Sequence, residues 1–115
     1  MAAALQGVWD FSYEHGSFEV AFLASGTFYC KDYLRKASFS VQDGVVLVDW
    51  ASCGHYTLTV GGDGKSMAGH ATNNSASWRK ATLKRALSDE EVKAMEAAVA
   101  GYVAPVHVHS ASCGH

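Results

Sequence analysis

Residues 37–50 read ASFSVQDGVVLVDW, and this stretch decides the fold class. In its first half, apolar side chains occupy every second position, which is the period of a half-buried β-strand. Gln42-Asp43-Gly44 follows as a strong turn signal, because an Asp-Gly pair adopts the positive φ angles of a tight hairpin turn. Val45 to Trp50 is then the most apolar strand of the chain. The stretch therefore predicts a β-hairpin.

The same alternation continues on both sides of this hairpin, from Leu5 to about Leu87. Turn signals such as Ser25-Gly26 and Gly61-Gly62-Asp63-Gly64 separate short strands, a spacing that is typical of an antiparallel meander. Closure into a barrel removes the edges that so many strands would expose. We therefore expect an all-β fold with one C-terminal helix, a small antiparallel up-and-down β-barrel of seven or eight strands. The expected strands are 5–13, 18–22, 28–33, 37–41, 45–50, 56–60, 67–71 and 76–83.

The inward positions of this barrel are mostly aromatic. One interpretation is a filled core, because small barrels often pack their interior with side chains. The other is an aromatic pocket for a small apolar ligand. On the third strand, Tyr29, Lys31 and Tyr33 are expected to point outward. The predicted inward residues are Trp9, Phe11, Phe22, Phe28, Phe39, Trp50, Tyr56 and Leu58.

A single helix is predicted after the last strand. Ser88 and Glu91 have the spacing of a capping box, and an apolar stripe at helical spacing follows. The stripe is expected to pack on the barrel wall or against a protein partner. The chain then divides into a barrel (1–87), a helix (88–103) and a flexible His- and Cys-containing tail (104–115). The stripe consists of Val92, Met95, Val99 and Tyr102.

Gly7-Val8-Trp9 at the start of the first strand resembles the Gly-x-Trp motif that opens lipocalins and other calycin barrels. The resemblance implies a ligand-binding barrel with a helix packed on its wall. It also implies that the tryptophan lies at the closed end of the barrel, under an arginine from near the last strand. The candidates for that arginine are Arg79 and Arg85.

Arg79 shares its parity with Leu83, so it points inward if no bulge intervenes. A buried guanidinium needs a partner, and it can hold a ligand carboxylate in bidentate fashion. Two alternatives are open: Arg79 stacks on Trp9, or a bulge turns Trp78 inward and Arg79 to solvent. The predicted ligand-binding residues are Trp9, Phe11, Phe22, Phe28, Tyr56 and Arg79.

Composition excludes several classes of protein. The chain has 115 residues, of which 17% are charged, with a formal net charge of −2. We therefore expect one globular domain that binds no nucleic acid. No apolar run has the length that spans a bilayer, and the start lacks the pattern of a signal peptide. Three cysteines, an odd number, predict reduced thiols. We expect a cytoplasmic protein with no membrane partner.

The sequence ASCGH occurs twice, at 51–55 and 111–115. Cys53 and His55 with their counterparts in the tail make up a potential tetrahedral zinc set, and His107 and His109 add two imidazoles. The Cys-x-His spacing is tighter than usual zinc spacing, so we interpret the repeat as an accident of composition and predict no metal site. No spacing marks a catalytic residue, and we expect no cofactor. The tail ligand set is His107, His109, Cys113 and His115.

Three functional hypotheses follow from the sequence. The first is a small lipocalin-like binding protein that holds an apolar or amphipathic small molecule in the barrel, with Arg79 as a polar anchor. The alternative is a non-catalytic interaction module, or a subunit of a larger assembly, that has a solid core and docks through its helix and tail. A small barrel enzyme is the weakest hypothesis.

Overall fold

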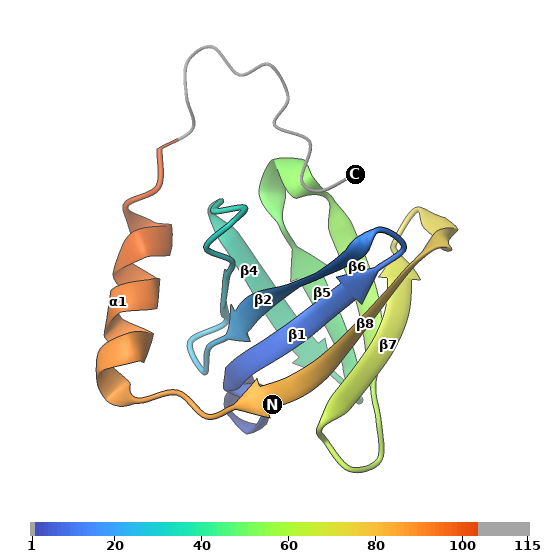
Figure 1. Cartoon of the computed structure of the whole chain (residues 1–115), viewed down its shortest axis with the longest axis horizontal. Coiled ribbons are helices and arrows are strands. Elements are labelled where there is room, and N and C mark those ends of the chain that lie inside the picture. Colours follow the sequence, from blue (N-terminus) through green and yellow to red (C-terminus); the bar gives the residue numbers. More distant parts are fainter. Residues whose placement is uncertain (1, 104–115) are drawn as a thin grey trace.

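The computed structural model describes residues 2–103, which form a closed barrel of eight antiparallel strands followed by one helix (Figure 1). The predicted fold class is confirmed. Each strand pairs with the next along the chain, and the last strand pairs with the first. The strands are β1 (Gly7–Tyr13), β2 (Gly16–Phe22), β3 (Thr27–Tyr29), β4 (Ala37–Gln42), β5 (Val45–Asp49), β6 (His55–Val60), β7 (Ser66–Ala71) and β8 (Asn74–Arg85). The helices are the 3-10 turns η1 (Ala2–Leu5) and η2 (Ala51–Cys53) and the α-helix α1 (Asp89–Ala100).

The hairpin that decides the fold forms as the sequence predicts. β4 pairs with β5 from Ser38 opposite Asp49 to Gln42 opposite Val45. The two residues between them, Asp43 and Gly44, have φ angles of 53° and 76°. Positive φ at both central positions gives the twist that matches the flanking strands.

One end of the barrel is closed by η1. The indole Nε1 of Trp9 donates a 2.9 Å hydrogen bond to the carbonyl oxygen of Leu5, and the Leu5 side chain is buried in the core. A Cβ atom on Gly7 would lie 2.8 Å from a methyl carbon of Leu83 and 2.9 Å from the carbonyl oxygen of Arg85. The glycine of the Gly-Val-Trp stretch is therefore required because β8 crosses β1 closely at this end.

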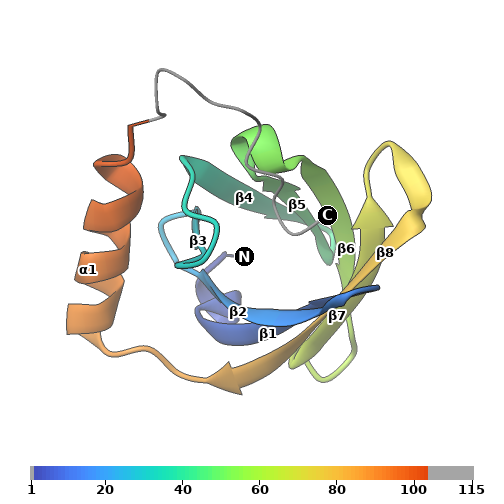
Figure 2. The same ribbon diagram turned by 45° about the horizontal axis from the view of Figure 1, so that its top comes forward.

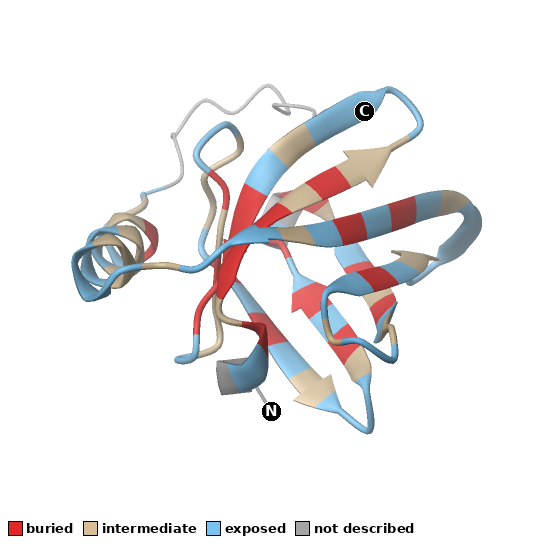
Figure 3. Ribbon diagram, turned by 60° about the horizontal axis from the view of Figure 1, so that its bottom comes forward, coloured by how far each residue is buried: buried red, intermediate tan, exposed pale blue. Residues whose placement is uncertain are grey.

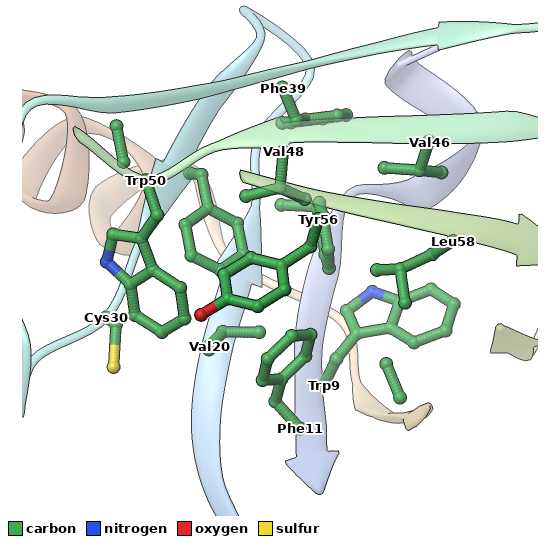
Figure 4. Packing of buried hydrophobic residues seen from close by; sticks show 14 of the residues in the cluster. Trp9, Phe11, Val20, Cys30, Phe39, Val46, Val48, Trp50, Tyr56 and Leu58 are labelled. Carbon is green, nitrogen blue, oxygen red and sulfur yellow. The ribbon is translucent and has the colours of Figure 1, made fainter. Parts of the chain in front are cut away.

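Side chains fill the interior of the barrel. All eight residues predicted to point inward are buried, as the alternation of burial along the strands shows (Figure 3). The aromatic rings among these residues meet edge to face. For example, the ring centroid of Phe11 lies 5.9 Å from that of Trp50 and 6.2 Å from that of Tyr56. This is the favoured arrangement and distance for aromatic pairs. Figure 4 shows the side chains of Phe11, Trp50 and Tyr56 directed toward one another between the strands.

The helix α1 lies outside the barrel, beside β3 (Figure 2). Ala21 on β2 is paired with Val8 on β1. Both side chains point to the outer face of the sheet, opposite to the core residues, yet they are only 1% and 3% exposed. Val99 of the apolar stripe is buried, and its other members are half-buried. We infer that the stripe packs against this outer face of the sheet.

The capping box predicted at the start of α1 is present. The side chain of Ser88 accepts a hydrogen bond from the Glu91 backbone, and the Glu91 carboxylate accepts one from the Ser88 backbone. The same carboxylate accepts two hydrogen bonds, of 2.8 and 3.1 Å, from the guanidinium of Arg85 at the end of β8. These contacts, with Arg85 first among them, lower the pKa of Glu91 to about 2. The pair ties the first turn of α1 to the barrel.

Candidate functional site

Strand β8 turns Arg79 inward and Trp78 outward. The Arg79 side chain is 6% exposed, whereas the neighbouring Trp78 is 40% exposed. Gly69 lies opposite Arg79 in the ladder between β7 and β8. The inward orientation predicted from parity is confirmed, and the alternative in which a bulge turns Trp78 inward is wrong. The register shift in this ladder occurs between His70 and Ala71, nearer the turn.

Two tyrosine rings and a carbonyl group surround the Arg79 guanidinium. Its central carbon lies 4.8 Å from the ring centroid of Tyr56 and 5.3 Å from that of Tyr13. Its Nη1 donates to the carbonyl oxygen of Trp78 at 2.8 Å, and its Nη2 lies 3.5 Å from the hydroxyl of Tyr56. Cation–π contacts of this kind stabilise a desolvated cation. The arrangement keeps a positive charge at the inner face of the barrel.

Neither candidate arginine takes the place that the calycin resemblance implies. Trp9 lies opposite Leu83 in the β1–β8 ladder. Leu83 is four residues from Arg79 on β8, which is a separation of about 13 Å along the strand. Arg79 therefore lies toward the end of β1 away from Trp9, and the alternative in which it stacks on Trp9 is wrong. Arg85 is exposed and pairs with Glu91. Instead of contacting an arginine, the indole N–H of Trp9 donates a hydrogen bond to the carbonyl oxygen of Leu5.

A pocket of about 380 Å³ opens beside Arg79, at the end of the barrel that carries η2 and the turn between β7 and β8. We call it the rim pocket. Its volume lies within the range of small-molecule sites, roughly 300–1,000 Å³. The lining residues are Cys53, Gly54, His55, Tyr56, Ala71, Thr72, Asn73, Asn74, Ser77 and Arg79.

Hydrogen bonds hold several lining side chains in place. The hydroxyl of Tyr56 donates to the carbonyl oxygen of Cys53 at 2.8 Å. The side-chain oxygen of Asn74 accepts from the backbone N–H of Ala76 at 3.1 Å, and the hydroxyl of Thr72 lies 2.9 Å from that of Thr57. A site whose side chains are held in this way binds a ligand with little loss of conformational entropy.

The structure brings two of the six predicted ligand-binding residues to this pocket, Tyr56 and Arg79. The other four are fully buried in the barrel interior at 0% exposure and pack on one another. For example, the ring centroids of Phe22 and Phe28 lie 5.1 Å apart, and those of Trp9 and Phe22 lie 5.9 Å apart. These four residues thus form the core below the pocket.

Sequence reasoning missed part of this end of the barrel. Tyr33, expected to point outward, lies with its ring centroid 5.2 Å from that of Phe18 and 6.4 Å from that of Trp50. The reason is that β3 ends at Tyr29, so strand parity no longer applies at Tyr33. Sequence reasoning also did not identify Thr72, Asn73, Asn74 and Ser77 as pocket-lining residues. The signal that could have pointed to them was the pair of adjacent asparagines at a turn.

The cysteines differ in state. Cys30 is a free thiol, 1% exposed, and burial raises its pKa to about 11. Cys53 is disulfide-bonded, so the prediction that every thiol is reduced is wrong at this residue. Within residues 2–103, no three His, Cys, Asp or Glu side chains are grouped closely enough to hold a metal ion. The predicted tail ligands and the second ASCGH lie outside the described residues.

No family model, no curated protein and no solved structure matches this chain. Its class is therefore defined by architecture: a closed, eight-stranded, up-and-down β-barrel that is compatible with the calycin plan. Across residues 2–103, each helix is too short or too polar to cross a membrane.

Proposed function

We propose that this chain is a small binding protein of lipocalin-like plan whose ligand occupies the rim pocket, with Arg79 as its polar anchor. The observation that carries the proposal is a buried cation lining a pocket of about 380 Å³. A ligand with a negatively charged group would gain a charge-assisted hydrogen bond at this position.

This proposal moves the ligand from the barrel centre, where the sequence placed it, to the rim. Rings in contact occupy the centre, and a ligand there would have to displace Phe11 or Phe28, both at 0% exposure. Displacing a buried phenylalanine sacrifices several kcal/mol of packing, about 3–5 by analogy with truncation to alanine. The rim pocket needs no such rearrangement, because its volume is already open.

The second candidate is a non-catalytic interaction module that docks on a protein partner. The filled core favours this reading. One observation weakens the hypothesis of a protein partner. The apolar stripe of α1, which was expected to contact that partner, is already half-buried or buried on the barrel. Leu47 and Trp78, which are large, apolar and exposed, lie on different strands, β5 and β8. The cytoplasmic location expected from the sequence stays a prediction.

The proposal is tested by titrating the ¹⁵N-labelled protein with a library of small charged and neutral molecules while recording amide shifts. We expect shifts to gather at Tyr56, at Ala71 to Asn74 and at Arg79. Arg79→Met should abolish them, whereas Lys80→Gln, an equal charge change on the outer face of the same strand, should not. Shifts centred on Trp9 and Phe28 would place the ligand in the core. A library that moves no resonance at the rim pocket would refute the binding function.

A further inference from the structure

We infer that a disulfide bond joins Cys53 to Cys113 and fastens the C-terminal segment of the chain to the edge of the rim pocket. The inference goes beyond the proposed function, because it needs no ligand and is tested separately. Three observations carry it: the bonded state of Cys53, the number of cysteines in the chain, and the place of Cys53 in the pocket wall.

The cysteine content of the chain identifies the partner of Cys53. The sequence contains three cysteines, at positions 30, 53 and 113. Cys53 is disulfide-bonded, whereas Cys30 is a free thiol. Within one chain this leaves Cys113, which lies outside the described residues, as the partner. The bond then joins the two copies of ASCGH, each through the cysteine at the same place in the motif.

The surroundings of Cys30 protect it from this reaction. Its side chain is 1% exposed, and burial raises its pKa to about 11. Disulfide exchange requires a thiolate, which is scarce at Cys30 at neutral pH. Cys53, in contrast, lines an open pocket, from which a second sulfur atom can approach it. The different surroundings of the two residues agree with the different states of their sulfur atoms.

The C-terminal segment is long enough to make the bond. Cys113 is ten residues after Val103, the last described residue, and an extended segment of this length spans up to about 33–36 Å. Figures 1 and 2 show the C-terminal end of α1 on the same side of the molecule as η2, the turn that contains Cys53. The segment therefore needs to cross one end of the barrel and not its length.

Hydrogen bonds fix the backbone of Cys53 at the edge of the pocket. Its N–H donates to the carbonyl oxygen of Trp50 at 2.9 Å, and its carbonyl oxygen accepts from the hydroxyl of Tyr56 at 2.8 Å. The Cα atoms of two disulfide-bonded cysteines lie about 4.4–6.8 Å apart. The bond therefore holds residue 113 beside the pocket wall, and its cleavage releases the end of the chain. The state of the bond thus changes the surroundings of the rim pocket.

The bond forms by exchange with a low-molecular-weight disulfide such as oxidised glutathione. The thiolate of one cysteine attacks a sulfur of oxidised glutathione, which gives a mixed disulfide and releases one molecule of reduced glutathione. The thiolate of the other cysteine then attacks the protein sulfur of the mixed disulfide and releases the second molecule. The two cysteines lose two protons and two electrons in total, which glutathione takes up. Dithiothreitol reverses the reaction.

Peptide mapping tests the pairing, because trypsin places the three cysteines in three different peptides: residues 1–31, 37–65 and 94–115. The full chain is refolded with reduced and oxidised glutathione, alkylated with iodoacetamide in denaturant without a reductant, digested and analysed by mass spectrometry. We expect peptides 37–65 and 94–115 to be joined, and Cys30 to be alkylated in peptide 1–31. A link to peptide 1–31, alkylation of all three cysteines, or a disulfide-linked dimer would overturn the inference.

Amide shifts test the effect of the bond on the pocket. Dithiothreitol should shift the resonances of η2 and of Ala71 to Asn74, and leave those of Gly44 and Val60 at the opposite end of the barrel in place. Cys113→Ala should abolish this response, whereas Cys30→Ala, the matched control, should keep it. An unchanged response in Cys113→Ala, or no response at the rim pocket of the wild type, would overturn the inference. Neither result decides whether the pocket binds a ligand, so the two proposals fail separately.

Discussion

The ring of Tyr56 lies 4.8 Å beneath the guanidinium carbon of Arg79, and the hydroxyl of the same tyrosine donates to the carbonyl oxygen of Cys53 in η2. One side chain thus contacts the cation of β8 and also fixes the turn before β6. Because Tyr56 is 3% exposed, both contacts are shielded from water. The geometry of the rim pocket therefore depends on the hydroxyl group as well as on the ring.

Tyr56→Phe should keep the cation–π contact and lose the hydrogen bond to Cys53. Since a buried carbonyl group is left without its donor, we expect unfolding free energy to fall by about 1–3 kcal/mol. Urea denaturation measures the change. Tyr13→Phe is the matched control, because it also keeps a ring beside Arg79. Equal losses in the two variants would show that the hydroxyl of Tyr56 has no special role.

Gly69→Ala should destabilise the barrel strongly. A Cβ atom at Gly69 would overlap the backbone carbonyl oxygen of Thr57 and lie 2.8 Å from the Cα of Leu58. Backbone atoms of a paired strand move only if the ladder distorts, so we expect a loss of about 3 kcal/mol or more. Gly62→Ala, where no atom lies within 4 Å of the new methyl group, should change the stability by less than about 0.5 kcal/mol. Similar melting temperatures for the two variants would contradict the close approach of β6 and β7.

Cys30 should be unreactive in the native protein. Its thiol is buried, and its pKa is raised from 9.0 to about 11, so the nucleophilic thiolate is scarce at neutral pH. We expect iodoacetamide to leave Cys30 unmodified in buffer and to alkylate it in denaturant, as read by mass spectrometry. Rapid labelling of the native protein would contradict this burial.

The same raised pKa predicts a dependence of stability on pH. In the unfolded chain the thiol loses its proton near pH 9.0, before it does so in the native state, so stability is lost as pH rises from about 9 to 11. The difference in unfolding free energy between the wild type and Cys30→Ala should shrink by about 2–3 kcal/mol over this window. A difference that stays constant from pH 8 to 11 would contradict the prediction.

Glu91 should stabilise the docking of α1 on the barrel at neutral pH, and this stabilisation should be lost in acid. Its native pKa of about 2 lies below the ordinary value of 4.5, so its contribution is present above about pH 4.5 and disappears as pH falls toward 2. Glu91→Gln should remove this dependence and speed hydrogen exchange of the α1 amides at neutral pH. Glu90→Gln, an equal charge change in the same turn, should have neither effect. Identical exchange in the two variants would show that the Arg85–Glu91 pair does not hold the helix.

Much of the fold could be predicted because its signals are local. The alternation around Gln42-Asp43-Gly44 specifies both the hairpin and the inner face of β4 and β5, and the capping box of Ser88 and Glu91 lies within four residues. These patterns depend on neighbours in the chain, where period and turn chemistry apply directly. The burial of all eight predicted inward residues follows from the same parity.

The site could be predicted only in part, because it depends on contacts between distant residues. Which end of the barrel holds Arg79 is set by the register of β1 against β8, and no pattern within either strand states that register. Tyr33 escaped prediction because it follows a strand of only three residues. The choice between Arg79 and Trp78 was open, since one bulge between Arg79 and Leu83 would have reversed it.

The pairing of β1 with β8 has a consequence for the synthesis of the chain. Seven of the eight strand contacts join neighbours in sequence, but the contact from Val8 to Arg85 joins the first strand made to the last. The local hairpins can form as they emerge, whereas the long closure is entropically costly and comes late. Until then β1 presents a free edge to other nascent chains. A product truncated before Asn74, the start of β8, would be an open sheet with two unpaired edges that can bind other chains. Cellular quality control would have to remove this product.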